Sequence, residues 1–298
     1  MPCIAPRYAN ATTANTTPVT TWTWYKGEWH EGNPHIIGPQ THGMWMASTV
    51  FDGARRINGK MPDLVPHCAR VLRSAELMGL APQITTDEIV ALVREGVQKF
   101  DPALALYIKP IVYGGEGFLA PTPESAQFVL CISVSDLPDA IKTGFTARKS
   151  SFRRPSPESA PTEAKASCLY PNVGRAVAEA TKDGFDTGVM LDPLGNVAEF
   201  SYANLFYAKD GKVFTPVING TFLNGLTRQR VIRLLREDGV DVTEKTVTYS
   251  ELENADEIFG TGNYYKVAPC VKLDDRNLQP GPITKRAQEL YWAFAEQS

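Results

Sequence analysis

The chain has 298 residues, of which 43% are hydrophobic and 21% charged, and its formal net charge is -3. This composition is that of an ordinary globular protein and excludes a wholly disordered chain, a collagen and a coiled coil. There is no basic stripe and no run of about 18 apolar residues, so neither a nucleic acid nor a membrane is expected as a partner. The length predicts one large or two medium domains.

Cysteine and histidine usage narrows the chemistry. The five cysteines are far apart, with no CxxC pair and no metal-ligand spacing, which favours a reduced protein and a cytoplasmic location. All four histidines lie between His30 and His67 and form no HExxH motif. We therefore expect no metal centre, and we expect a group other than histidine to move protons if the chain is an enzyme.

The first half of the chain predicts a small α+β domain over residues 22–136. It follows a Thr-, Asn- and Ala-rich segment, residues 1–21, that is expected to be a flexible tail. Residues 137–163 are richer in Pro, Ser and charge and predict an interdomain linker at 137–145 with an ordered loop after it. The predicted elements are a strand at 22–25, helices over 67–78 and 86–100, and strands at 105–112 and 128–134.

The second half, residues 146–298, predicts a larger domain of helices and hairpins. Its turns are marked by Asp192-Pro-Leu-Gly195 and Lys209-Asp-Gly211. The predicted elements are helices over 172–183, 227–238, 248–252 and 284–295, hairpins of 188–192 with 195–199 and of 204–208 with 212–215, and a strand over 255–262.

Two glycine-containing segments could bind an anion through backbone N–H groups. Gly225-Leu-Thr227 precedes a helix, whose free amides and dipole attract a phosphate; the alternative is an ordinary helix start capped by Thr227. Gly260-Thr-Gly-Asn263 follows a strand and could form a second anion nest, or only a tight turn. Neither segment has the spacing of a nucleotide P-loop.

Lys165 and Glu199 are the side chains most suited to chemistry. Lys165 stands among small residues, where burial would lower its pKa and make the amine a nucleophile; a solvated surface lysine is the alternative. Glu199 ends an apolar strand and could face either water or a ring nitrogen that must stay protonated.

In their order and spacing, these segments resemble the class IV, or fold type IV, pyridoxal 5'-phosphate (PLP) aminotransferases, the group of branched-chain and D-amino-acid aminotransferases. The resemblance implies PLP as cofactor and a two-domain α+β fold, with a small N-terminal domain and a larger pseudo-barrel C-terminal domain. It runs from about Trp24 to Phe294 and is carried by Val50-Phe-Asp-Gly-Ala-Arg55, Ala164-Lys-Ala166, Gly195-Asn-Val-Ala-Glu199, Asn204-Leu-Phe206, Gly225-Leu-Thr-Arg228, Ala255-Asp-Glu-Ile-Phe259 and Gly281-Pro-Ile-Thr-Lys285.

The resemblance implies catalytic roles for three residues. Lys165 is identified as the lysine that forms the Schiff base with PLP and then carries a proton. Glu199 would pair with the pyridine nitrogen and keep it protonated, and Tyr170 would contact the ring hydroxyl. Arg154 matches an arginine that the family also carries before its lysine.

The phosphate of PLP needs a cation and backbone amides, and the resemblance implies which residues supply them. Arg55, not Arg56, is identified as the arginine that grips the phosphate. Leu226 and Thr227 would offer their N–H groups at a helix N-terminus. Asn263 replaces a family threonine close to phosphate and substrate.

The chain departs from the branched-chain enzymes around the expected substrate pocket. Lys109 stands in place of the arginine of Y-I-R-P and keeps the charge without the bidentate fork. Trp45 falls in the segment that reads H-Y-G in the family, and Phe200 stands where a small residue is usual. Core packing is the alternative for the aromatic members of the candidate set. The candidate substrate-binding residues are Tyr25, Trp45, Tyr107, Lys109, Phe200 and Tyr264.

The resemblance therefore implies a transaminase that moves an amino group from an amino acid to a 2-oxo acid, with branched-chain L-amino acids and glutamate as the default donors. An (R)-selective amine or D-amino-acid transaminase is the main alternative, and an aminodeoxychorismate lyase-like enzyme or a non-catalytic PLP-binding protein are others. Lys109 favours a substrate with a carboxylate. Because the family's active site lies between two chains, a homodimer or a dimer of dimers is expected.

Overall fold

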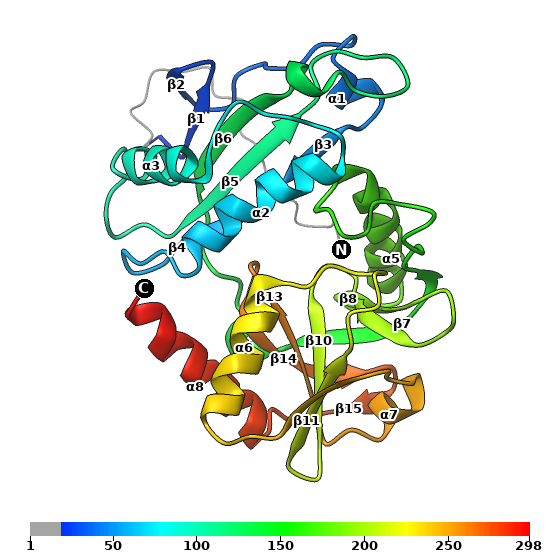
Figure 1. The fold of residues 1–298 in the computed structure, drawn as a ribbon. Helices are drawn as coiled ribbons and strands as arrows, with labels where there is room; N and C mark the ends of the chain where they lie inside the picture. The colour runs from blue at the N-terminus through cyan, green and yellow to red at the C-terminus, as the bar shows by residue number, and fades with distance from the viewer. Residues whose placement is uncertain (1–18) are drawn as a thin grey trace.

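Two β-sheets dominate the computed structural model, which describes residues 19–298 (Figure 1). Strands from residues 21–134 form the first sheet and strands from residues 145–277 form the second. The segment between them contains only the short helix α4 (Ala140–Thr143). Of the predicted tail, residues 1–18 lie outside the described residues, and Thr21 already belongs to the first strand.

The first sheet is antiparallel, with the order β2-β1-β6-β5-β3 and with β4 paired to β5. Its central strand β5 alternates buried and half-buried residues, as expected for a sheet covered by helices on one face. The strands are β1 (Thr21–Tyr25), β2 (Glu28–Glu31), β3 (Thr49–Phe51), β4 (Ala54–Arg56), β5 (Leu106–Tyr113) and β6 (Gln127–Val134).

Helix α2 (Leu64–Leu77) lies across one face of this sheet (Figure 1). Its apolar residues recur at helical spacing and so form one face that packs on the strands. Cys68, Val71 and Ala75 are buried there against the strands. Helix α3 (Thr86–Val97) begins with a capping box in which Thr85 and Glu88 satisfy each other's backbone N–H groups. Two short helices, α1 (His42–Trp45) and η1 (Pro123–Ser125), lie in the connections.

The second sheet has the order β12-β11-β10-β13-β14-β7-β8-β9, with β15 paired to β14. Pairing is parallel between β7 and its two neighbours and between β11 and β12, and antiparallel elsewhere. Its strands are β7 (Phe145–Arg153), β8 (Thr187–Leu191), β9 (Val197–Phe200), β10 (Asn204–Lys209), β11 (Lys212–Pro216), β12 (Val242–Lys245), β13 (Glu257–Gly262), β14 (Lys266–Leu273) and β15 (Arg276–Asn277).

This sheet curls into a half-barrel, since β9 at one end of the order packs against β10 and β11 near the other end. Leu205 and Ile258 fill the inside of the curl, while Phe206 and Phe259 stack on the outside with ring centroids 5.0 Å apart. The helices α6 (Leu226–Glu237) and α8 (Pro282–Glu296) cover that outer face (Figure 1). The remaining helices are η2 (Ser167–Leu169), α5 (Tyr170–Lys182), which packs on β7 and β8, and α7 (Tyr249–Glu253).

The predicted α+β architecture with a pseudo-barrel in its second half is confirmed, but three strands of that sheet with four or more residues were not predicted, and neither was the two-residue β15. The segment after the predicted linker is not a loop: residues 145–153 form β7 in the middle of the sheet. The segment is rich in Arg, Lys and Ser, which is typical of a loop, but its first residues alternate between buried Phe145 and Ala147 and less buried positions, as in a strand. β12 and β14 were also missed. Within residues 19–298, no helix is long and apolar enough to cross a membrane.

Candidate active site

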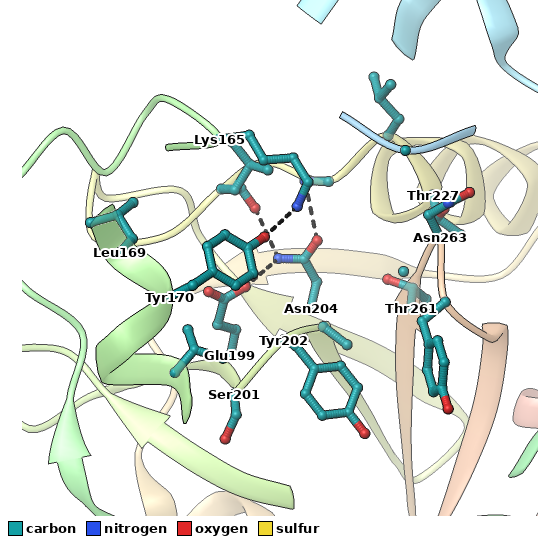
Figure 2. Close-up of a pocket in the computed structure, with 18 of the residues that line it drawn as sticks. Lys165, Leu169, Tyr170, Glu199, Ser201, Tyr202, Asn204, Thr227, Thr261 and Asn263 are labelled. Carbon is teal, nitrogen blue, oxygen red and sulfur yellow. Dashed lines mark hydrogen bonds between the residues drawn. The ribbon is translucent and has the colours of Figure 1, made fainter. Parts of the chain in front are cut away.

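A pocket of about 490 Å³ lies between the two sheets (Figure 2). The first half of the chain supplies Phe51, Gly53, Arg70 and Tyr107 to its lining. The second half supplies most of the residues predicted to bind the cofactor. These are Lys165, Tyr170, Glu199, Leu226, Thr227 and Asn263.

Lys165 enters the pocket from a segment that is tied to the first half of the chain. Its backbone N–H donates to Ser74 Oγ of α2 (3.1 Å), and its carbonyl accepts from Phe51 N–H of β3 (3.1 Å). Its Nζ donates to Tyr170 Oη (2.6 Å) and lies 4.8 Å from the ring centroid of Phe51 (Figure 2). The amine is therefore held at one point on the pocket wall by both halves of the chain.

The pKa of Lys165 differs from the sequence expectation. Burial by itself lowers the pKa of an ammonium, as expected, but Tyr170 and Asp52 more than offset that effect, so the pKa is raised above its ordinary value. The expected decrease considered burial alone, because the sequence does not show that Tyr170 Oη lies 2.6 Å from Lys165 Nζ.

Glu199 is buried on β9 and faces two partners. Arg154 Nε lies 3.4 Å from Glu199 Oε1 and also donates to Thr221 O, and Asn204 Nδ2 donates to Oε2 (3.1 Å). Burial raises the pKa of Glu199 to about 7, and the charges of Arg154 and Lys165 only partly oppose this rise. Such a carboxyl group can share or hold a proton with a basic ring nitrogen placed beside it.

Asn204 connects this carboxylate to the glycine loop before α6. Its Nδ2 also donates to Leu223 O (2.9 Å), and its Oδ1 accepts from Gly225 N–H (3.1 Å). Gly225 is the N-cap of α6, and no side chain of the described residues caps this helix. The alternative of a cap by Thr227 is thereby excluded, and the first-turn amides of Leu226 and Thr227 border the pocket.

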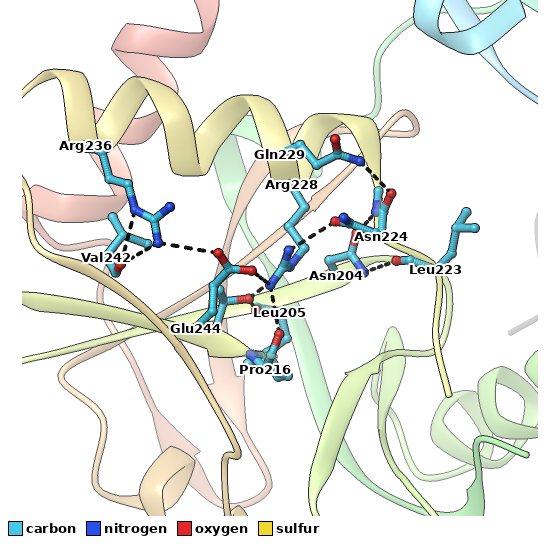
Figure 3. A network of polar contacts seen from close by, with 12 residues as sticks. Asn204, Leu205, Pro216, Leu223, Asn224, Arg228, Gln229, Arg236, Val242 and Glu244 are labelled. Atoms are coloured by element: carbon cyan, nitrogen blue, oxygen red, sulfur yellow. Dashed lines mark hydrogen bonds and ion pairs between the residues drawn. The ribbon is translucent and has the colours of Figure 1, made fainter. Parts of the chain in front are cut away.

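A buried arginine fixes the N-terminal turn of α6 from behind (Figure 3). Arg228 is 1% exposed, and its guanidinium donates to Asn224 Oδ1 (3.1 Å), Pro216 O (2.8 Å) and Glu244 Oε2 (2.9 Å). Three N–H groups at its Nη atoms are thus tied to the loop and to the sheet. The arginine of the Gly225-Leu-Thr-Arg228 motif therefore positions the helix end and does not line the pocket.

Arg70 of α2 is a cation on the pocket wall that the sequence analysis did not single out. Asp52 accepts from both Nε (2.6 Å) and Nη2 (2.9 Å) of Arg70 and also contacts His67 Nδ1 (2.7 Å). Asp52 is fully buried, and its pKa is lowered because Arg70 and His67 outweigh the effect of burial. This carboxylate holds two sides of the guanidinium and leaves Nη1 for the pocket.

The structure places Arg55, the predicted phosphate arginine, outside the pocket lining. Its side chain is 1% exposed and is not part of the pocket lining. Its Nη1 donates to Ser135 O (2.9 Å) and its Nε to Asn263 O (3.0 Å). Arg55 is thus occupied behind the wall that Asn263 forms, because β4 directs its side chain to the junction of the two halves.

Three buried polar atoms of pocket residues lack a hydrogen-bond partner among residues 19–298. They are Arg70 Nη1, Thr261 Oγ1 and Asn263 Nδ2. Buried donors without partners are costly, and here they come from two separate segments around one pocket, α2 and the end of β13. Together with the α6 amides they fit a group with several anionic oxygens, such as the phosphate of PLP.

The predicted substrate-binding residues divide into two groups. Tyr107 and Tyr264 line the pocket. Phe200 is instead a core residue, fully buried edge-on against Phe145 with ring centroids 5.0 Å apart. Outside the pocket lie Tyr25, whose Oη contacts Tyr113 (3.3 Å), the exposed Trp45, and Lys109, whose Nζ lies 5.6 Å from the Tyr107 ring.

Comparisons with known proteins agree with this site. The amino-transferase class IV family matches residues 49–273 of the chain. The branched-chain-amino-acid aminotransferase of Pseudomonas aeruginosa is 33% identical over 284 residues, 90% of this chain and 91% of that protein. A crystal structure of an aminotransferase from Brucella abortus bound to PLP has a TM-score of 0.91 and 48% identity, covering 93% of this chain and 99% of that one. The branched-chain aminotransferase from Thermoproteus uzoniensis with norvaline has a TM-score of 0.86 and 30% identity, covering 94% and 96%.

Proposed function

Because this chain belongs to the class IV aminotransferases and is a PLP-dependent transaminase, we propose that it moves the amino group of a branched-chain L-amino acid or of glutamate to a 2-oxo acid in the pocket between its sheets. The observation that carries the proposal is the meeting of an amine, a carboxyl group with a raised pKa and three unpartnered buried polar atoms in this pocket. The substrate class follows the names of relatives such as the Pseudomonas aeruginosa enzyme.

In this proposal the residues at one end of the pocket would hold the phosphate of PLP, and those at the other end would face its ring nitrogen. Arg70 and the first-turn amides of Leu226 and Thr227 bind the phosphate. Glu199 meets the ring nitrogen, and its carboxyl pKa near 7 suits it to a proton shared with that base. When bound, PLP supplies a pyridine ring that accepts the electron pair released as the donor's Cα loses a proton.

Lys165 carries out the proton transfer in this proposal. Its Nζ would hold PLP and, as a free amine, would take the proton from the donor's Cα. Tyr170 Oη, 2.6 Å from Nζ, gives the amine a hydrogen-bond partner while it is free. Since Lys165 can act as the base, histidine is not needed for this step, and His67 is buried against Asp52.

The test is a set of single half-reactions with one donor at a time. The purified protein is loaded with PLP, and bleaching of its visible band is followed with L-leucine, L-glutamate, D-alanine and (R)-1-phenylethylamine. Bleaching by L-leucine and L-glutamate is expected. If only D-alanine or the (R)-amine bleaches the band, the substrate proposal is wrong although the transaminase assignment stands.

One observation favours the second candidate, an (R)-selective amine or D-amino-acid transaminase. Lys109, the charge that favoured a substrate carboxylate, does not line the pocket. Two bulky side chains, Tyr202 and Tyr264, stand edge to face in the lining with ring centroids 5.9 Å apart. Both rings limit the space for the donor's side chain. The four-donor panel discriminates between the two candidate functions.

The protein is also proposed to work as a homodimer, or as a dimer of dimers, through the α1 patch, which consists of Met44, Trp45, Met46, Phe118 and Leu119. All five side chains are exposed, Phe118 and Leu119 by 73% and 77%, and the Trp45 and Phe118 rings lie 5.9 Å apart. An apolar cluster of this kind is typical of an interface. A second copy would cover the patch and complete the pocket with residues such as Trp45.

Sedimentation velocity tests the assembly. The double variant Trp45→Asp, Leu119→Asp is expected to sediment as a monomer, and the wild type as a dimer or larger. Leu194→Asp is the matched control, because Leu194 is 88% exposed on the turn between β8 and β9, outside the patch. A monomeric wild type would refute the assembly.

A cytoplasmic location is proposed as well, supported by free Cys68, Cys131, Cys168 and Cys270.

A further inference from the structure

The turn that carries Asn263 is held by two buried cations that the proposed reaction does not use. Arg55 Nε donates to the backbone carbonyl of Asn263 (3.0 Å), and Lys266 Nζ donates to its side-chain Oδ1 (2.6 Å). Arg55 and Lys266 are each 1% exposed. Both oxygens of Asn263 are therefore engaged from behind the pocket wall.

The lysine decides which way the amide of Asn263 points. An ammonium has donors only, so it must face Oδ1, and Nδ2, on the other arm of the planar amide, then points away from the lysine. Burial and the nearby Arg55 lower the pKa of Lys266 to about 7, and an anion bound in the pocket would favour its charged, donor-only form. Lys266 itself is fixed by a left-handed backbone conformation, with φ at 63°, at the start of β14.

The Nδ2 of Asn263 lies beside Gly53 and Tyr107 in the pocket wall. A Cβ placed on Gly53 would lie 3.0 Å from Asn263 Nδ2 and 2.3 Å from Tyr107 Oη, so both polar atoms crowd the same glycine. Gly53, Tyr107 and Asn263 all line the pocket. Asn263 Nδ2 is buried without a partner among residues 19–298, which marks it as a donor kept for a ligand.

We propose that Lys266 is a positioning residue that, with Arg55, orients Asn263 so that its Nδ2 donates to an oxyanion in the pocket. Two oxyanions are available in this enzyme, the phosphate of PLP and the carboxylate of an amino-acid donor. The carboxylate case rests on the proposed function, whereas the phosphate case does not. The device requires asparagine at this position, because a hydroxyl side chain has no amide to orient.

The phosphate case is tested by binding to the apoenzyme, without turnover. Lys266→Met removes the donor at similar volume and is expected to raise the Kd for PLP about tenfold, the loss typical of one hydrogen bond to a charged group. The Kd for pyridoxal, which lacks the phosphate, should change less than about twofold. Lys272→Met, on the same strand, is the matched control and should change neither value.

The carboxylate case is tested on the loaded enzyme with L-leucine and with 3-methylbutan-1-amine, which lacks only the carboxylate. If Nδ2 serves the carboxylate, Lys266→Met raises the half-saturation concentration for leucine about tenfold and leaves that for the amine unchanged. An effect confined to PLP, or confined to leucine, supports the proposal and identifies the oxyanion. If the wild type reacts with no amino acid, the proposed function fails, yet the PLP and pyridoxal measurements still test Lys266.

A double-mutant cycle separates orientation from a general structural role. In an Asn263→Thr background, Lys266→Met should have almost no further effect on either ligand, because no amide remains to be oriented. Melting temperatures and circular dichroism of the four apoproteins verify folding. The proposal is overturned if Lys266→Met acts equally in both backgrounds, if it weakens PLP and pyridoxal alike together with leucine and the amine, or if it changes neither PLP nor leucine binding.

Discussion

At the cofactor end of the pocket, each important side chain is held by buried partners, whereas at the mouth the side chains are held by few. Arg70 is fixed by Asp52, and Glu199 by Arg154 and Asn204. Tyr202 and Tyr264, in contrast, are 39% and 50% exposed and contact mainly each other's rings and that of Tyr265. The contrast teaches that the residues at the buried end of the pocket are pre-organised by this chain, while those at the mouth form a looser surface on which the substrate range is expected to depend.

The largest effect is expected from Lys165→Ala, which removes the amine that lies in the pocket beside Tyr170. Transaminase activity should fall by at least about a thousandfold, because both the covalent hold on PLP and the proton carrier are lost. The visible band of the loaded enzyme should shift, as measured by absorbance. Lys182→Ala, an exposed change at the end of α5, is the control and should leave both unchanged. Full activity in Lys165→Ala would refute the assignment.

A smaller effect is expected at Arg70, and it discriminates between the two candidate arginines. Arg70→Lys keeps the charge but loses the fork that Asp52 holds, so the Kd for PLP should rise about ten- to a hundredfold. The matched change Arg94→Lys, on the exposed side of α3, should have no effect. Fluorescence titration of the apoproteins measures these constants. An unchanged Kd in Arg70→Lys would remove Arg70 from the phosphate site.

The pair Arg55 and Arg70 also illustrates how far the sequence could predict the site. Motif order placed Lys165, Tyr170, Glu199 and the α6 start in one pocket, because a motif keeps its local geometry. Motif order could not predict which arginine lines the pocket, because that depends on which side of a strand or helix faces the second sheet. Arg70 lies in a helix that was predicted from its apolar spacing, but the partner that aims it, Asp52, is distant in sequence.

The fold shows the same division between local and long-range information. Helices α2, α3 and α6 follow from apolar periodicity and caps, and they were predicted to within a few residues. The strand β7 was not predicted because its partners β8 and β14 lie far along the chain, so no hairpin turn in the sequence indicates its pairing. The burial of Phe200 likewise depends on Phe145, at the start of that missed strand.

The pKa of Glu199 gives a test of the cofactor end that needs no substrate. In the folded apoprotein burial raises the pKa of Glu199 to about 7, so the carboxyl group keeps its proton up to that pH, whereas the unfolded chain releases it near the ordinary glutamate pKa of 4.5. The folded state thus binds more protons between these values, so the free energy of unfolding should fall as pH rises from about 4.5 to 7. The total for this group is on the order of 3 kcal/mol.

Glu199→Gln should remove that part of the pH dependence, because the amide does not titrate. Urea unfolding of the two apoproteins at a series of pH values isolates the contribution, since other titrating groups are common to both. The loaded enzyme should also lose activity in the variant, because a neutral amide does not keep the ring nitrogen protonated. Parallel stability curves for the wild type and Glu199→Gln would contradict the raised pKa.

The smallest effect is expected at the mouth, where Tyr264→Ala removes a half-exposed ring. PLP affinity should change less than about twofold, because the side chain is only partly desolvated and belongs to the looser end of the pocket. The half-saturation concentrations for the donors should instead change relative to one another, by up to about tenfold, as expected for altering an apolar pocket wall. Tyr249→Ala, far from the pocket on α7, is the control for loss of a tyrosine. If Tyr264→Ala weakened PLP as strongly as Arg70→Lys, the two ends of the pocket would be one cooperative unit, and the separation between fixed cofactor chemistry and adaptable substrate range would not hold.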